Sequence, residues 1–208
     1  MRKEREIKYL KVDELTQLFR ILDSDSTRHG ARNRAIFYLA YYCALRVSEI
    51  THMEFSAYDP HHQQIYCRRE KGSNHNTLRL IDRQVLSTLN DYLKIRHLLY
   101  PESHYLFPSQ MGSPISRQQL DTLMKKYCKS TAIPSDKHHF HVLKHTRAVA
   151  LGDSGLDIKD IQWWLGHKSI ENTMIYMQYT TCQQEALYQK LTEKERSFYE
   201  NCSNQRYI

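Results

Sequence analysis

Apolar residues recur at helical spacing through the first part of the chain. The pattern predicts a helix from Val12 to about Asp23 and, after a polar stretch, a second helix from about Arg32 to Leu45. The second helix is apolar around most of its surface, so we expect it to lie in the core. The apolar positions are Leu15, Leu18, Phe19 and Leu22 in the first helix, and Ile36, Phe37, Leu39, Ala40 and Cys43 in the second.

The apolar period shortens to about two between Met53 and Ile81. Three short strands are predicted there, at residues 55–58, 64–67 and 77–80, with turn-forming residues between them. Short strands with such tight connections pair as an antiparallel sheet. We expect the second turn, Lys71 to Asn74, to reach into solvent.

Helical spacing returns after the sheet and predicts further helices up to about residue 199, with an extended stretch at residues 105–108 and a polar tail after the last helix. Ser116 is suited to cap one of these helices, and Pro101 ends another. The predicted fold class is therefore mainly α with a small three-stranded antiparallel sheet. The predicted helices span residues 82–99, 117–132 and 183–199, with three compact helices between His141 and Ile175.

Length and composition limit the kinds of protein this can be. With 208 residues, 40% apolar and 25% charged, the chain fits one globular domain. No window approaches the roughly 18 apolar residues of a membrane span, and the basic start lacks the apolar core of a signal peptide. Five cysteines without a CxxC pair indicate reduced thiols and a cytoplasmic protein. We divide the chain into a basic arm (1–11), a main domain (12–182) and a C-terminal helix with a polar tail (183–208).

The charge balance indicates a polyanionic partner. Thirty Lys and Arg against 23 Asp and Glu leave a formal net charge of +7. Residues 117–147 hold seven Lys or Arg against two Asp, which fits a surface that follows a nucleic-acid backbone. The basic residues expected to contact DNA are Arg117, Lys125, Lys126, Lys137 and Arg147.

Four short stretches carry the candidate chemistry. They are Ala44 to Ile50 (ALRVSEI), Glu70 to Asn74 (EKGSN), His141 to Thr146 (HVLKHT), and Leu165 to Tyr176, which begins LGH and ends TMIY. In this order and at this spacing they resemble the catalytic domain of the tyrosine recombinases, or phage integrase family, whose fold is like that of type IB topoisomerases. The resemblance covers almost the whole chain, from about Val12 to Tyr179. The length is similar to that of the small recombinases that invert a fimbrial promoter segment.

The resemblance implies a site that cuts DNA without a metal or other cofactor. Tyr176 would attack phosphorus and form a covalent 3′-phosphotyrosine, which conserves the bond energy for resealing. Lys71 would protonate the leaving oxygen, and His141 would accept the tyrosine proton or bind the phosphate. Arg46 and His167 would hold the non-bridging oxygens. The implied partners are double-stranded DNA and other copies of the chain, as a tetramer on synapsed DNA and a monomer or weak dimer when free.

One position departs from the family pattern. The family has an arginine three residues after its first histidine, and this chain has Lys144 there. Lysine keeps the charge but not the planar guanidinium fork, so we expect weaker transition-state stabilisation, for which Arg147 one turn further on is a candidate to compensate. Two alternatives to a recombinase stay open. One is a catalytically weakened DNA-binding regulator on the same scaffold, and the other is a DNA-relaxing enzyme, which the motif spacing disfavours.

Nearby residues have simpler explanations. The histidines at 138–141 and 145 lack the cysteines or carboxylates that complete a metal site, and a basic DNA-facing loop explains them better. Tyr179 is a rival nucleophile, but the spacing from His167 favours Tyr176, and helix packing accounts for Tyr179. His145 is expected to be a buried, hydrogen-bonded helix residue. Glu49 either orients the preceding arginine or caps its helix.

Overall fold

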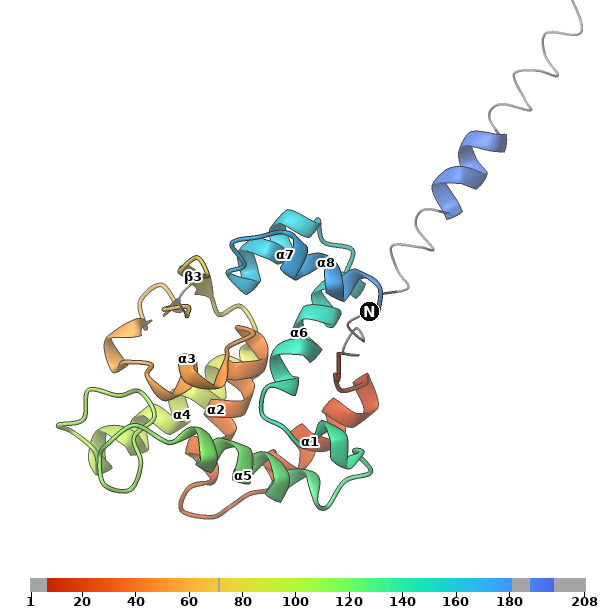
Figure 1. Cartoon of the computed structure of the whole chain (residues 1–208). Helices are drawn as coiled ribbons and strands as arrows, with labels where there is room; N and C mark the ends of the chain where they lie inside the picture. The colour runs from red at the N-terminus through yellow and green to blue at the C-terminus, as the bar shows by residue number, and fades with distance from the viewer. Residues whose placement is uncertain (1–6, 71, 181–187, 197–208) are drawn as a thin grey trace, which may run out of the picture.

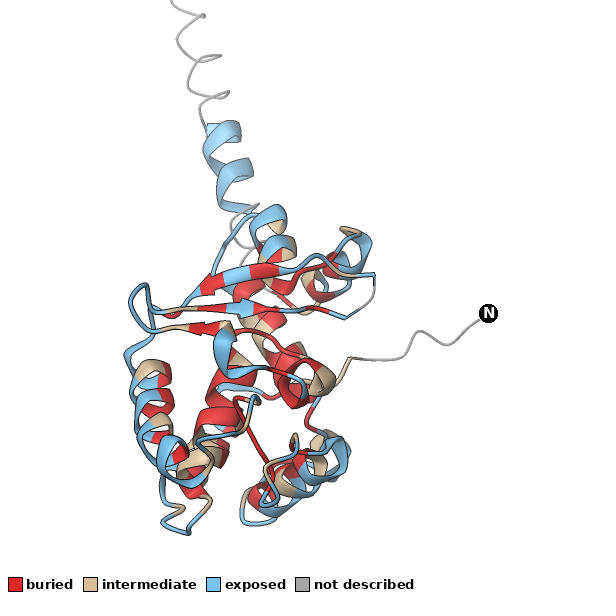
Figure 2. Ribbon diagram, turned by 90° about the vertical axis from the view of Figure 1, so that its left-hand side faces the viewer, coloured by how far each residue is buried: buried red, intermediate tan, exposed pale blue. Residues whose placement is uncertain are grey.

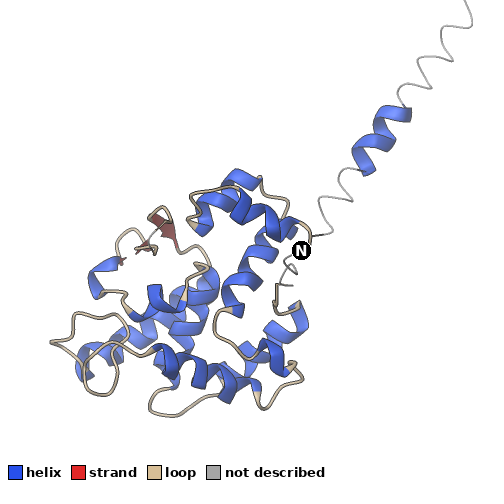
Figure 3. Ribbon diagram, in the orientation of Figure 1, coloured by secondary structure: helices blue, strands red, loops and turns tan. Residues whose placement is uncertain are grey.

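The computed structural model describes residues 7–70, 72–180 and 188–196, and it confirms a mainly helical fold with a small three-stranded antiparallel sheet (Figure 1, Figure 3). The helices are α1 (Val12–Asp23), α2 (Gly30–Tyr42), α3 (Val47–Thr51), α4 (Arg83–Leu99), α5 (Arg117–Cys128), α6 (Val142–Asp153), α7 (Ile158–Leu165) and α8 (Glu171–Met177). Two short 3-10 helices are η1 (Phe55–Ala57) and η2 (Ser135–Lys137). The strands are β1 (Tyr58–Asp59), β2 (Gln64–Cys67) and β3 (Asn76–Arg79).

Polar caps determine where two of the long helices begin. Asp82 precedes α4, and its Oδ1 accepts hydrogen bonds from the backbone N–H groups of Gln84 and Val85, at 2.8 and 3.2 Å. Ser116 precedes α5, and its Oγ accepts from the N–H of Gln119 at 3.1 Å, while the Gln119 side chain accepts from the Ser116 N–H at 3.0 Å. These bonds satisfy amide groups that have no partner within the helix. The predicted cap at Ser116 is confirmed.

Two helices end earlier than their apolar pattern indicates. α2 stops at Tyr42 rather than Leu45, because Ala44 adopts the left-handed conformation (φ 50°) and the Leu45 N–H bonds to a carbonyl five residues earlier. This closure is a Schellman motif, which usually has glycine at the left-handed position. α5 stops four residues before its predicted end, because the N–H and hydroxyl groups of Thr131 both donate to the carbonyl of Cys128, at 3.0 and 2.7 Å.

The sheet has the predicted antiparallel order, β1-β2-β3, with shifted ends. Residues 55–57, predicted as strand, form η1 because the Ala57 N–H bonds to the carbonyl of Glu54 at 3.1 Å, so pairing begins only at Tyr58, opposite Ile65. The third strand begins one residue early, at Asn76. A one-residue shift of this kind leaves the alternation of buried and exposed side chains unchanged.

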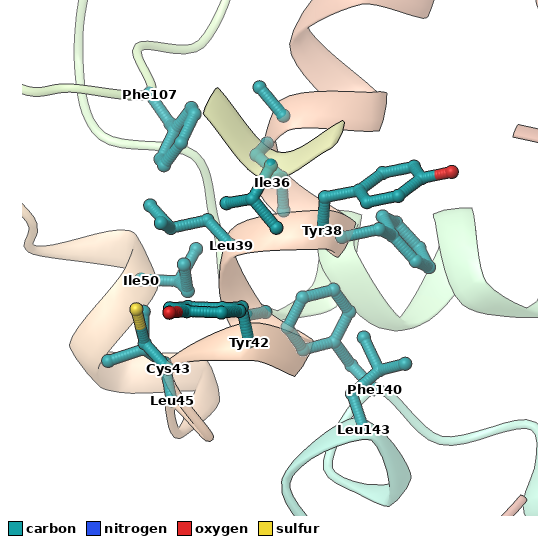
Figure 4. Close-up of a cluster of buried hydrophobic side chains, with 14 of the residues drawn as sticks. Ile36, Tyr38, Leu39, Tyr42, Cys43, Leu45, Ile50, Phe107, Phe140 and Leu143 are labelled. Atoms are coloured by element: carbon teal, nitrogen blue, oxygen red, sulfur yellow. The ribbon is translucent and has the colours of Figure 1, made fainter. Parts of the chain in front are cut away.

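α2 forms the centre of the main core, as its apolar pattern predicts. α1, α4 and α6 pack against it, and Figure 2 shows the buried residues concentrated at this centre. Most residues of α2 are buried, so this helix contributes to the core on nearly all of its sides. Figure 4 labels the cluster: Ile36, Tyr38, Leu39, Tyr42 and Cys43, with Leu45, Ile50, Phe107, Phe140 and Leu143.

A second, smaller apolar cluster joins α6, α7 and α8. Part of the predicted N-terminal arm packs beside it, because the N–H of Leu10 donates to Thr146 Oγ1 at 2.9 Å and the N–H of Ile7 donates to Tyr179 Oη at 3.0 Å. The side chain of Leu10 is buried. Residues 7–10 therefore belong to the folded body, and residues 1–6 of the predicted arm lie outside the described residues.

The predicted C-terminal helix is described only in part. Residues 188–196 are helical and exposed, while the rest of 183–199, including Ala186 and Leu187 of the predicted apolar stripe, lies outside the described residues. Leu191, the third member of that stripe, is exposed. In the described part of the chain, no helix has the length and apolar character required to cross a membrane.

Candidate active site

Arg46 lies at the N-terminus of α3 and is held by a carboxylate one turn further on. Glu49 accepts a hydrogen bond from the Arg46 backbone N–H through Oε2 at 2.9 Å and another from Arg46 Nη1 through Oε1 at 2.7 Å. Glu49 therefore orients the arginine and caps the helix at once, which unites the two roles the sequence left open. Burial opposes ionisation of Glu49, but the Arg69 charge and the Arg46 amide outweigh it and keep its pKa below the ordinary value.

Arg69 has a fully buried side chain and ties four segments of the chain together. Its Nη1 lies 3.2 Å from Glu49 Oε2, and its guanidinium also donates to the carbonyls of Ala44 and Trp164, at 3.3 and 2.8 Å. Its Nε donates to the side chain of Asn76 at 3.0 Å. These bonds connect Arg69, which follows β2, to the end of α2, to α3, to the start of β3 and to the end of α7. The guanidinium fork thus fixes the separation of segments that carry candidate catalytic residues.

Lys144 lies on α6 and is 2% exposed. Its Nζ donates to the carbonyl of Ala44 at 3.3 Å. Burial, followed by the positive charge of Arg46, lowers the pKa of Lys144 to about 7, although Glu49 acts in the opposite direction. Lys144, which stands where the family pattern has an arginine, is therefore an internal lysine whose charge changes near neutral pH.

The turn between β2 and β3 lies against the site, while Gly72 and Asn74 in it are exposed to solvent as predicted. The N–H of Asn74 donates to the carbonyl of Gly166 at 2.8 Å, and Ser73 Oγ accepts a hydrogen bond from Arg46 Nη1 at 3.2 Å. On the other side of the turn, the N–H of Glu70 donates to a Glu49 oxygen at 3.2 Å. Lys71 itself lies outside the described residues.

His167 follows α7 in a glycine-dependent turn. Gly166 has a φ of 67°, and a Cβ at this position would lie 2.6 Å from the carbonyl oxygen of Asn74 and 2.8 Å from Arg69 Cγ. The His167 ring is buried, and its Nδ1 is 3.0 Å from Thr173 Oγ1. Burial, with the nearby charges of Lys144 and other cations, lowers the pKa of His167 to about 3. A neutral ring is therefore held with one nitrogen already engaged.

Tyr176 is buried at the centre of this group, on α8. Its hydroxyl oxygen lies 2.9 Å from Nδ1 of His145, and its ring is nearly parallel to that of His167, with centroids 6.3 Å apart. His141 precedes α6 and packs perpendicular to His145 at 4.4 Å between ring centroids. Burial raises the pKa of Tyr176 to about 12, against a smaller opposing effect from Arg46.

The structure therefore brings five of the six sequence-predicted catalytic residues into one cluster. Burial lowers the pKa of His141 and that of His167, and the positive charges of Lys144 and Arg46 lower both values further. Tyr176 lies against His167 and His145 and within reach of the Arg46 charge. The sixth residue, Lys71, lies outside the described residues. Within the described residues, no three His, Cys, Asp or Glu side chains gather so that they could hold a metal ion.

Three of the predicted DNA-contacting residues are exposed on α5. Arg117 lies near Glu70, with Nη2 3.4 Å from a carboxylate oxygen, and borders a cavity of about 750 Å³ beside the site. Lys126 Nζ lies 3.7 Å from Asp25, and Lys125 is exposed further along the same helix. Glu70 also accepts a hydrogen bond from Ser48 and lies 4.0 Å from Arg46 Nε. An exposed carboxylate thus stands at the mouth of the site.

The other two predicted DNA contacts are engaged inside the protein. Lys137 Nζ bonds to both carboxylate oxygens of Glu14, at 2.7 and 2.9 Å. The guanidinium of Arg147 lies among aromatic rings, and its Nε is buried without a hydrogen-bond partner in the described residues. This location does not support the idea that Arg147 replaces the missing arginine at the site. The rings are those of Tyr42, Trp164 and Tyr41, whose centroids lie 5.0, 5.1 and 5.5 Å from the guanidinium carbon.

Sequence reasoning missed two members of the site. Arg69 has a usable signal, because the alternation that buries Ile65 and Cys67 continues to Arg69 and places it on the inner face beyond the end of β2. His145 was expected to be buried and hydrogen-bonded, but its partner is the candidate nucleophile. No spacing rule identifies that contact, because it depends on how α8 packs against α6.

Known proteins are similar to this chain in sequence. Residues 8–182 match the model of the phage integrase family. The chain is 33% identical over 150 residues to the type 1 fimbriae regulatory protein FimB of Escherichia coli K12. The aligned region covers 71% of this chain and 74% of FimB. It is 28% identical over 179 residues to the tyrosine recombinase XerD of Rickettsia prowazekii, covering 80% of this chain and 57% of XerD.

Solved structures show the same fold. The site-specific recombinase XerH, in a post-cleavage complex with its palindromic difH substrate, superposes with a TM-score of 0.76 at 23% identity. The match covers 88% of this chain and 52% of the XerH chain. The chain thus spans roughly half the length of the Xer proteins it matches and about three quarters of FimB.

Proposed function

Because the chain belongs to the phage integrase family, we propose that it is a site-specific recombinase that cuts and rejoins duplex DNA through a 3′-phosphotyrosine at Tyr176. The observation that supports this most is the cluster of the buried Tyr176, His167 and Lys144 with the half-buried Arg46, which come from four separate segments of the chain. A phosphodiester needs a nucleophile and fixed positive charge for cleavage without a metal, and this cluster has both.

Each residue has a role that follows from its contacts. Arg46 is oriented by Glu49 and binds the non-bridging oxygens, as does His167, whose Nδ1 is engaged by Thr173 so that Nε2 is left for the phosphate. Lys144 adds a compact charge that is present below about pH 7 and is restored at higher pH by a bound phosphate. Lys71 protonates the leaving 5′-oxygen.

The partners in this proposal are double-stranded DNA and further copies of the chain. Arg117, Lys125 and Lys126 are the exposed cations of α5, and they contact the DNA backbone beside the cleavage site. Recombination joins two duplex sites, and each of their four strands is cut by one subunit, so the active assembly is a tetramer on synapsed DNA. The outcome is inversion, integration or excision, according to the orientation and location of the two sites.

A DNA-binding regulator on the same scaffold is the second candidate. Two observations favour it: Lys144 stands in place of the family arginine, and Glu70 places a negative charge 4.0 Å from Arg46, where a phosphate would bind. FimB is itself described as a regulatory protein. This candidate binds DNA at a specific sequence and forms no covalent intermediate.

Cleavage of a nicked DNA substrate separates the two candidates. Duplexes from the DNA flanking the gene carry a nick close to each candidate site, so that cleavage releases a short fragment and traps the protein on the DNA. We expect a denaturant-resistant adduct with the native protein and with Tyr179→Phe, and none with Tyr176→Phe, which still binds DNA because only one oxygen is lost. An adduct that depends on Tyr179 refutes the assignment. Binding without any adduct favours the regulator.

A further inference from the structure

The hydroxyl of the proposed nucleophile is paired with a histidine that the family pattern does not assign to it. In the described part of the chain, Tyr176 Oη is 2.9 Å from His145 Nδ1, while His141 contacts the other side of His145. We propose that His145 is the catalytic base of this site: its Nδ1 takes the phenolic proton as Tyr176 attacks phosphorus. This inference rests on the proposed recombinase function and names the group that activates its nucleophile.

The geometry gives different tasks to His141, which precedes α6, and to His145, which lies on it. His145 reaches the reacting oxygen directly, within the distance at which proton transfer occurs. His141 lies one helical turn earlier, is exposed, and has its ring perpendicular to that of His145. His141 is therefore available to bind a phosphate oxygen. The remaining candidate acceptor, His167, has its Nδ1 engaged by Thr173.

The charges keep the proton on Tyr176 until substrate arrives. Burial, with smaller contributions from His141 and Lys144, lowers the pKa of His145 to about 3, while burial raises the pKa of Tyr176 to about 12. His145 is therefore neutral, and when it accepts from the phenol its own proton is on Nε2. As the oxygen bonds to phosphorus, its proton becomes far more acidic and the phosphorane gains negative charge. Both changes drive the proton to His145 during attack.

The step balances without any further reactant. The Tyr176 O–H bond breaks, the bond from its oxygen to phosphorus forms, and the bond from phosphorus to the 5′-oxygen breaks. The proton from Tyr176 stays on His145 as imidazolium, and the leaving oxygen receives a proton from the separate acid. On resealing, the 5′-hydroxyl returns its proton to that acid and attacks phosphorus, and His145 gives its proton back to the departing tyrosine oxygen.

His145→Asn is the decisive variant, because the Asn side chain occupies the position of Nδ1 and accepts a hydrogen bond but not a proton. On a duplex that the native protein cuts, we expect single-turnover cleavage to slow by about 100-fold or more with DNA affinity unchanged. His145→Ala should be equally slow and should recover part of its rate when imidazole is added. This second variant decides the matter if the Asn protein does not fold.

A second substrate distinguishes activation of the nucleophile from protonation of the leaving group. When sulfur replaces the bridging 5′-oxygen, the leaving thiolate needs no proton, so a variant that lacks only the acid regains its rate. We expect Lys71→Ala to be restored on this substrate and His145→Asn to stay slow. The inference is overturned if His145→Asn regains its cleavage rate on the sulfur substrate. It is also overturned if His145→Asn cuts the ordinary substrate at a rate within about threefold of the native protein. A native protein that forms no adduct refutes the proposed recombinase function itself.

Discussion

Replacing Lys144 with methionine tests how the site holds its charges. The side chain is 2% exposed, and burial followed by the Arg46 charge lowers its pKa from 10.5 to about 7. Between these two values the unfolded chain carries a proton on Lys144 that the folded chain does not. Stability therefore rises with pH across this window, because the unfolded state binds more protons. Methionine fills a similar volume and does not titrate, so Lys144→Met removes this dependence.

The size of the effect follows from the pKa shift. One proton of difference between the two states changes the free energy of unfolding by about 1.36 kcal/mol per pH unit. From about pH 7.5 to about pH 9 the native protein should therefore gain about 2 kcal/mol relative to Lys144→Met. The window closes above about pH 10, because Lys144 of the unfolded chain, with its ordinary pKa of 10.5, then loses its proton as well and the two states no longer differ.

Urea unfolding followed by circular dichroism at several pH values measures this difference. The quantity to compare is the free energy of unfolding of the native protein minus that of the variant, since groups common to both cancel. An equal dependence on urea concentration in both proteins shows that the unfolded states are comparable. A difference that stays constant from about pH 7.5 to about pH 9 would mean that Lys144 keeps an ordinary pKa and that the buried position does not perturb it.

Three further predictions address other parts of the molecule. Lys144→Arg should raise the single-turnover cleavage rate by about tenfold, because it restores a bidentate cation. Lys144→Ala should nearly abolish cleavage with little change in DNA affinity, because one positive charge is lost from the site. An alanine variant that cuts as fast as the native protein places Lys144 outside the reaction. Gly166→Ala should lower the free energy of unfolding by about 3 kcal/mol, because its Cβ would lie 2.6 Å from the Asn74 carbonyl oxygen; a stability equal to native in thermal unfolding contradicts this. Removal of residues 183–208 should leave folding and single-site binding intact but weaken synapsis in gel-shift assays, and an unfolded truncated protein would show instead that this segment completes the core.

The helices were predictable because their burial follows the period of the sequence. Leu18 and Leu22 of α1 and nearly every apolar residue of α2 are buried as their spacing requires. The ends were less predictable where the decisive residue carries no local signal. Ala44 terminates α2 in a conformation that glycine usually adopts, so its sequence looks like continuing helix. The tertiary bonds from Arg69 and Lys144 to the Ala44 carbonyl accompany that conformation.

The candidate site was predictable as a set of motifs but not as a network of contacts. The resemblance to the tyrosine recombinases pointed to Arg46, His167 and Tyr176, because each stands in one of the four motifs that carry it. The pairing of Tyr176 with His145 depends on the packing of α8 on α6, and the burial of Arg69 depends on the end of α7. These contacts join residues 31 and 95 positions apart, and no local pattern encodes such separations.

The unusual state of Lys144 follows from the number of cations around one carboxylate. Glu49 balances Arg46 and Arg69 through direct contacts, so Lys144 is a third positive group beside a single buried negative charge. In the absence of DNA, the least costly adjustment is for the lysine to lose its proton, since an arginine cannot. Under the proposed function, a bound phosphodiester supplies the missing negative charge and favours the protonated lysine. Lysine at this position would then couple the charge of the site to occupancy by DNA, which the arginine of the family pattern cannot do.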